Sequence, residues 1–189
     1  MIYNSEHFTI SLLQQKDALQ LNKLLVCNTE RFIDHLPTTL EENSTLEGTK
    51  NYISRQIKAA KKKKTFVFVI NDQLSRDIIG MIVLKNLDWK IMKGEFAYCI
   101  GKRFKGKGMM TEAIKQTTIY AIETLGLKSL EILTLKTNAS SVNVALKSGF
   151  RWKKTLKNEF MTLNGKPQDI ELFEFLVTCK VSKTDLQGF

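Results

Sequence analysis

The segment Arg103–Ala113, RFKGKGMMTEA, constrains the fold more than any other part of this chain. The residues before it, Phe96 to Ile100, are typical of a strand, and those after it, Met109 to about Leu125, of an amphipathic helix. Glycines let the backbone approach a ligand closely, and the first amides of a helix have no partner within it and carry partial positive charge. A strand, a glycine loop and a helix start, in this order, predict an anion site, most often for phosphate.

Length and charge bound the rest of the chain. With 189 residues, we expect one domain over residues 1–180 and a C-terminal tail over residues 181–189. No apolar run approaches the roughly 20 residues that span a bilayer, and no signal peptide is recognisable at the start. The formal net charge of +10 attracts anions, which include nucleic acid, an acidic partner and a phosphorylated cofactor, and does not choose among them.

The few cysteines and histidines argue against a disulfide framework and against a metal site. The three cysteines are widely spaced and odd in number, which fits reduced thiols in a cytoplasmic protein. With two histidines, no His/Cys cluster suggests a metal ion. The cysteines are Cys27, Cys99 and Cys179, and the histidines are His7 and His35.

Hydrophobic periodicity and turn residues predict about seven strands and five helices. We expect strands at 7–13, 65–70, 77–87, 95–100, 130–135, 150–156 and 168–177, and helices at 16–26, 28–35, 45–64, 109–125 and 140–147. The polar stretch Thr38–Ser44 is expected to be a loop, and Asn164-Gly165 a hairpin turn.

The order of these elements excludes two common phosphate-binding folds. The strand, helix and strand around the glycine loop imply a parallel pair with a right-handed crossover. The strands before the loop lack crossover helices, as a dinucleotide fold would require, and no Gly-Lys-Ser/Thr follows, as a Walker loop would require. The chain is therefore predicted to be a mixed α+β domain with a mostly antiparallel sheet.

At this point the residues resemble a known family. The pattern Arg103-x-x-Gly106-x-Gly108 resembles the acyl-CoA pyrophosphate loop of the GCN5-related N-acetyltransferases (GNAT). Glu95–Ile100, Asn138-x-x-Ser141 and Lys147–Phe150 are similar to the branch that acetylates the N-termini of ribosomal proteins, at alanine or serine. The resemblance covers nearly the whole chain, and it implies a central mixed, mostly antiparallel twisted sheet of about seven strands flanked by helices.

The resemblance also implies acetyl-CoA as the acetyl donor, with no metal. By this reading, the strand end at Cys99 and Ile100 pairs with the pantetheine arm, and Asn138 reaches that arm from the opposite side. The pyrophosphate would be held by the loop and the first turn of the helix, that is by Arg103, Lys105, Gly106, Lys107, Gly108, Met109, Met110 and Thr111.

Acetyl transfer needs a base for the attacking amine and a proton donor for the leaving thiolate. Glu95 is the candidate base, although a glutamate at a strand end can equally be an exposed surface residue. Ser141 is the candidate donor, although Asn138 or Ser140 could simply cap the helix that contains it. Glu159 is an alternative carboxylate, and Cys99 is interpreted as a strand residue, since nothing near it in sequence provides a basic partner.

The predicted function is therefore that of a cytoplasmic N-acetyltransferase whose favoured acceptor is a protein N-terminus of the ribosomal-protein type. A small amine (a polyamine, an antibiotic or an amino acid) is the alternative acceptor, and an acidic groove lined by Glu41, Glu42, Glu47 and Glu159 would suit a cationic one. A non-catalytic CoA-binding or RNA/ribosome-binding module is the alternative from another class. Nucleic-acid and membrane binding are not expected, and a monomer and a homodimer both stay open.

Overall fold

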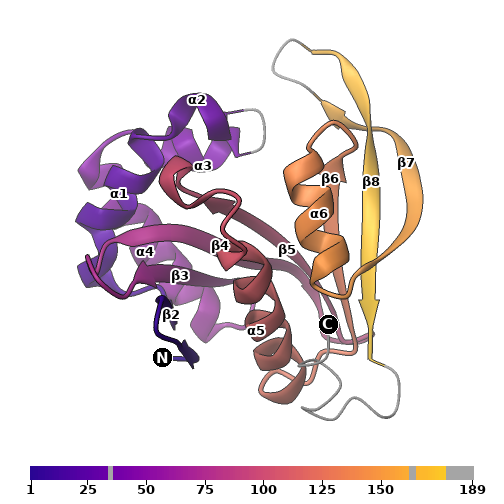
Figure 1. The fold of residues 1–189 in the computed structure, drawn as a ribbon, viewed down its shortest axis with the longest axis horizontal. Coiled ribbons are helices and arrows are strands. Elements are labelled where there is room, and N and C mark those ends of the chain that lie inside the picture. The colour runs from indigo at the N-terminus through magenta and orange to yellow at the C-terminus, as the bar shows by residue number, and fades with distance from the viewer. Residues whose placement is uncertain (34–35, 162–164, 178–189) are drawn as a thin grey trace. The chain divides into compact units, whose positions relative to one another are not determined.

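A computed structural model describes residues 1–33, 36–161 and 165–177 of the chain. The strands are β1 (Tyr3–Asn4), β2 (Phe8–Leu12), β3 (Phe66–Asp72), β4 (Ile78–Asp88), β5 (Lys93–Ile100), β6 (Ser129–Leu135), β7 (Arg151–Met161) and β8 (Pro167–Leu176). The helices are α1 (Ala18–Val26), α2 (Thr29–Phe32), α3 (Pro37–Glu42), α4 (Leu46–Lys61), α5 (Met109–Glu123) and α6 (Ala139–Lys147), with short 3-10 turns at η1 (Gln15–Asp17) and η2 (Lys102–Phe104) (Figure 1).

The strands form one sheet in the order β1-β2-β3-β4-β5-β6-β8-β7. The parallel β5–β6 pair confirms the predicted strand–helix–strand unit, and its register runs from Lys93 with Ser129 to Phe96 with Ile132. The β2–β3, β6–β8 and β7–β8 pairs are antiparallel. The sheet is therefore mixed, as predicted. No helix in the described part of the chain is long and apolar enough to cross a membrane.

The chain folds into two compact units, of which the first contains Met1–Val83 and Tyr98–Lys107. Its core is built by α1 and α4 with β3 and β4, and the fully buried side chains include Leu21, Ile53 and Met81. The residues of β3 from Phe66 to Ile70 are all buried, as their unbroken apolar run predicts.

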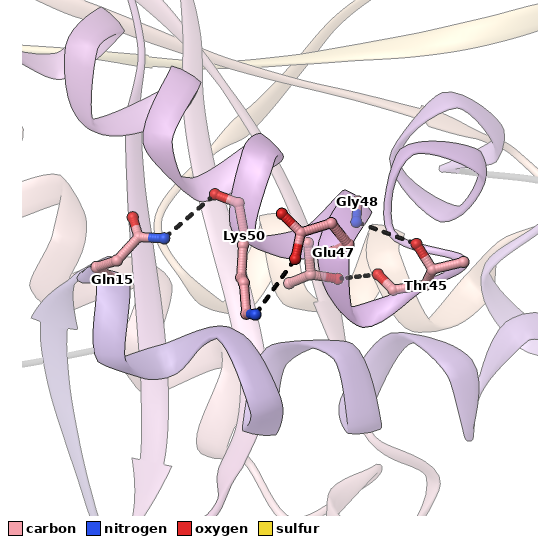
Figure 2. Close-up of polar contacts among 6 residues, drawn as sticks. Gln15, Thr45, Glu47, Gly48 and Lys50 are labelled. Atoms are coloured by element: carbon pink, nitrogen blue, oxygen red, sulfur yellow. Dashed lines mark hydrogen bonds and ion pairs between the residues drawn. The ribbon is translucent and has the colours of Figure 1, made fainter.

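The start of α4 shows how local sequence fixes an element of this unit (Figure 2). The Thr45 hydroxyl accepts a hydrogen bond from the Gly48 amide at 3.0 Å, which makes Thr45 an N-cap. One turn on, Lys50 Nζ lies 3.2 Å from Glu47 Oε2, and the Lys50 carbonyl accepts a hydrogen bond from Gln15 Nε2 at 3.3 Å. These contacts hold the beginning of α4 beside η1.

The second unit contains Leu84–Ala97 and the chain from Gly108 onward. Its aromatic core joins Phe96, Phe150 and Phe175, whose ring centroids lie 6.4 Å and 5.6 Å apart in succession. The Ser148 hydroxyl, at the end of α6, donates to the Thr111 carbonyl in the first turn of α5 at 3.2 Å. Packing and this hydrogen bond fix α6 against the start of α5.

The structure corrects several predicted elements. Residues Thr38–Ser44 are not a loop, since most of them belong to α3, which starts with proline at its first turn, where the missing amide costs nothing. The sheet has eight described strands instead of about seven, because the two-residue β1 was too short to predict. The helix expected from Lys16 begins as the turn η1, and β7 extends to Met161. Asn164, His35 and the tail at 181–189 lie outside the described residues.

Candidate active site

The glycine loop has a backbone that only glycine adopts easily. β5 ends at Ile100, η2 follows, and Gly106 and Gly108 then have φ angles of +79° and +77°. α5 begins immediately afterwards at Met109, with Gly108 as its N-cap. Because left-handed φ values disfavour residues with a Cβ, the turn itself favours glycine at both positions of the motif.

The loop is also open where a ligand would approach it. A Cβ added to Gly106 or Gly108 would meet no atom of the described residues within 4 Å. The first helical hydrogen bond of α5 joins the Glu112 amide to the Gly108 carbonyl, so the amides of residues 109–111 precede the helical ladder. Glycine backbone, open space and helix-start amides fit the pyrophosphate of an acyl-CoA.

The charged side chains of the loop are exposed, while one predicted binding residue is not. Arg103, Lys105 and Lys107 are exposed to solvent, and Lys107 Nζ lies 5.4 Å from the centre of the Phe104 ring. The Met110 side chain is buried, so it can serve a ligand only through its backbone amide. The side chains of Arg103, Lys105 and Lys107 add to the positive potential of the helix start.

The strand end before the loop is anchored by the junction of α1 and α2. The Asn28 carbonyl oxygen Oδ1 accepts from the Lys102 amide at 3.0 Å, and its Nδ2 donates to the Leu24 carbonyl at 2.8 Å. Arg31 Nη1 donates to the Ile100 carbonyl at 3.3 Å. Neither residue was assigned this anchoring role from the sequence, because both contacts join residues about 70 positions apart.

Cys99 and Ile100 lie at the end of β5, past the residues of that strand that pair with β6. Cys99 is buried, and this burial raises the pKa of its thiol to about 12. The side chain therefore stays protonated near neutral pH, which agrees with its interpretation as a strand residue and not a nucleophile. The pairing of this strand end with a pantetheine arm stays a prediction.

Asn138 and Ser141 lie together at the start of α6. Asn138 is the N-cap, and its side-chain oxygen accepts a hydrogen bond from the Ser141 amide at 3.1 Å. The helix-capping alternative considered from the sequence is thus present in the structure. It leaves the Ser141 hydroxyl in the first turn of the helix, since the cap uses only the backbone amide of that residue.

Glu95 lies in β5 and is held from β4 by two consecutive residues. Lys85 Nζ lies 3.1 Å from Glu95 Oε1, and Asn86 Nδ2 donates to Glu95 Oε2 at 2.8 Å. The side chain of Glu95 is only 16% exposed, compared with 42% for Lys85. Glu95 is therefore a half-buried, oriented carboxylate and not an exposed residue at a strand end.

Glu95 also opens a row of carboxylates across the sheet that the sequence did not reveal. Its register partner on β6 is Glu131, whose partner on β8 is Glu174. Each has its own lysine at 2.7 Å, Lys93 for Glu131 and Lys153 for Glu174. The row is visible only once the strand registers are known.

Two other considerations from the sequence concern Glu159 and metal ions. Glu159 lies in β7 and is exposed, unlike Glu95. Within the described residues, no group of three or more His, Cys, Asp or Glu side chains could hold a metal ion.

Comparisons with known proteins agree with this geometry. A family model for an acetyltransferase (GNAT) domain matches residues 7–151. The Bacillus subtilis (strain 168) protein named "Putative ribosomal N-acetyltransferase YdaF" is 32% identical over 174 residues, which are 91% of this chain and 92% of that protein.

Two solved structures share the fold. A ribosomal-protein-S5-alanine acetyltransferase from Vibrio fischeri superposes with a TM-score of 0.85 at 21% identity, over 95% of this chain and 98% of that one. The microcin C7 self-immunity acetyltransferase MccE, solved with acetyl-CoA and AMP, superposes with a TM-score of 0.81 at 22% identity, over 92% and 94%. The chain therefore belongs to the GNAT family of acetyl-CoA-dependent N-acetyltransferases.

Proposed function

We propose that this enzyme acetylates the α-amino group of a protein N-terminus, with a ribosomal protein as the favoured substrate and Glu95 as the base. The observation that carries the proposal is the Glu95 carboxylate itself, which is half-buried and oriented by contacts at 3.1 Å and 2.8 Å from Lys85 and Asn86. The name of the B. subtilis relative supports a ribosomal acceptor. When bound, acetyl-CoA supplies the acetyl group as a thioester. The acceptor nitrogen forms a bond to the acetyl group as the C–S bond to CoA breaks.

The residues of this chain have separate tasks in that reaction. The amides and cations of residues 103–111 hold the pyrophosphate, the strand end at Cys99 and Ile100 pairs with the pantetheine arm, and Asn138 contacts that arm. Glu95 takes the proton that the amine loses, directly or through one water. Ser141 donates a hydrogen bond to the departing thiolate.

The charge around Glu95 favours an N-terminal amine over a polyamine. The ammonium of Lys85 already matches the carboxylate, so Glu95 offers no unmatched negative charge to recruit a polycation. An α-amino group with a pKa of about 7.7–8.0 is roughly a third neutral at pH 7.5, whereas an alkyl amine with a pKa of about 10.4 is only about 0.1% neutral. Because the Glu95 carboxylate is already paired with Lys85, we expect its substrate to be the α-amino group, which loses its proton near neutral pH, and not an alkyl amine.

A thiol-release assay with acetyl-CoA and an acceptor panel tests the proposal. The panel contains peptides that begin with alanine or serine, the same peptides with blocked N-termini, and spermidine. We expect turnover with the free N-termini, none with the blocked ones, and a kcat/KM at least tenfold lower for spermidine. The variant Glu95→Gln should lose about 10²-fold or more in kcat, as removal of a general base does. Faster turnover of spermidine would overturn the acceptor, and an unchanged kcat in Glu95→Gln would overturn the base.

A further inference from the structure

Asn86 has an unusual backbone for a residue inside a strand. It lies in β4, yet its φ is +51°, in the left-handed region that residues with a side chain rarely occupy. In a regular strand, consecutive side chains point to opposite faces of the sheet. Here the consecutive side chains of Lys85 and Asn86 reach the two oxygens of one carboxylate, that of Glu95. The left-handed residue therefore turns the Asn86 amide toward the side that Lys85 already faces.

The turn after β4 does not account for this conformation. That turn has its own contacts, since Asp88 Oδ1 accepts from the amides of Lys90 at 2.9 Å and Ile91 at 3.3 Å. It also has its own left-handed residue, Met92, with a φ of +56°. Asn86 precedes these features in the chain, and its side-chain amide donates to Glu95.

Stability does not account for the arrangement either. The Lys85 side chain is 42% exposed, and ion pairs open to solvent contribute little to folding. A non-glycine residue with left-handed φ costs free energy, although asparagine tolerates it better than most residues. Strain of this kind persists where the surrounding structure imposes it, and it is concentrated at functional sites. The left-handed backbone of Asn86 thus costs free energy while its side chain orients a carboxylate.

We propose that Lys85 and Asn86 are positioning residues for the Glu95 carboxylate. Each binds a different oxygen, which fixes the rotation of the group and leaves each oxygen a second lone pair for the acceptor amine or a bridging water. Asn86 sets the angle through a neutral donor, and Lys85 supplies the matching charge. This inference rests on the proposed role of Glu95 as the base.

The variant Asn86→Gly separates positioning from fold. Glycine adopts the same left-handed φ without strain but has no amide to donate to Glu95. We expect a melting temperature no lower than that of the unsubstituted enzyme, a kcat with an N-terminal peptide about tenfold lower, and a KM for acetyl-CoA within twofold. A tenfold loss is a modest part of the roughly 10²–10⁴-fold that general base catalysis supplies. Arg76→Gly, also at a left-handed φ of +61°, is the matched control and should leave kcat unchanged.

The role of Lys85 is tested by one variant that removes its charge and one that keeps it. Lys85→Met removes the ammonium that holds Glu95 Oε1, so kcat with an N-terminal peptide should fall about as much as in Asn86→Gly while the KM for acetyl-CoA stays within twofold, whereas Lys85→Arg should restore kcat. A normal kcat in Asn86→Gly, or a lower melting temperature in that variant, would overturn the positioning role of Asn86, and an unchanged kcat in Lys85→Met would overturn that of Lys85. An unchanged kcat in Glu95→Gln would instead refute the base on which both depend, so the two failures are distinguishable.

Discussion

Replacing Gly106 with alanine tests whether the glycine loop is shaped for a ligand or for the fold. The φ of Gly106 is +79°, and an added Cβ would meet no atom of the described residues within 4 Å. The free energy of unfolding should therefore fall only by the left-handed strain, about 1–2 kcal/mol. For a chain of this size, each kcal/mol lowers the melting temperature by about 2–4 °C, so a loss of about 2–8 °C is expected.

The effect on the free energy of CoA binding should be similar or somewhat larger. The alanine methyl occupies the open space in front of the loop, where the pyrophosphate would lie against the backbone. Loss of one amide–phosphate hydrogen bond costs about 1.5–3 kcal/mol, which at about 1.4 kcal/mol per factor of ten makes the Kd for CoA about ten- to a hundredfold weaker. Titration calorimetry with CoA and scanning calorimetry of the free protein measure the two halves separately.

Gly165 offers a matched control. Its φ is +70°, and an added Cβ there would also meet no atom within 4 Å in the part of the chain that the structure describes. Gly165→Ala should therefore lower the melting temperature about as much as Gly106→Ala and leave the affinity for CoA unchanged. Wild-type affinity in Gly106→Ala would refute the loop as the pyrophosphate site. A loss of stability far beyond that of Gly165→Ala would refute the argument that the space in front of Gly106 is open.

Three further predictions concern single residues. Asn138→Ala removes the N-cap of α6 and should cost about 0.5–2 kcal/mol of stability, measured by urea unfolding, whereas Asn138→Asp should keep most of it. Asn28→Ala removes the acceptor of the Lys102 amide, so hydrogen exchange at that amide should accelerate. Iodoacetamide at pH 8 should label the exposed Cys27 and not Cys99, whose raised pKa of about 12 keeps it protonated below that value, and peptide mass spectrometry would show the sites.

The sequence predicted well the features that depend on local chemistry. The loop at Gly106 and Gly108 was identifiable because a turn with two glycines directly before a helix is visible in adjacent residues. The Asn138 cap was foreseen as an alternative for the same reason. The mixed sheet followed from the order of strands and helices, since a strand–helix–strand unit pairs in parallel.

The contacts that distinguish the candidate base could not be predicted in this way. Asn86 belongs to an ordinary polar strand end in the sequence, and its left-handed backbone has meaning only beside Glu95, nine residues further along the chain. The partnership of Glu95 with Glu131 depends on the register of a parallel pair, which a one-residue slip would abolish. Such features follow from tertiary pairing and not from local propensity.

The ion pairs bear directly on the choice of acceptor. Two of the four glutamates expected to line an acidic groove are instead matched by cations of the same chain: Glu42 lies 2.7 Å from Arg55, and Glu47 lies 3.2 Å from Lys50. Glu95 is matched as well, and the whole chain carries a formal net charge of +10. A small polycation would approach this protein against the mean field. A peptide N-terminus carries at most one positive charge at its reactive end and loses it near neutral pH. This basic protein therefore repels it less than it repels a polyamine.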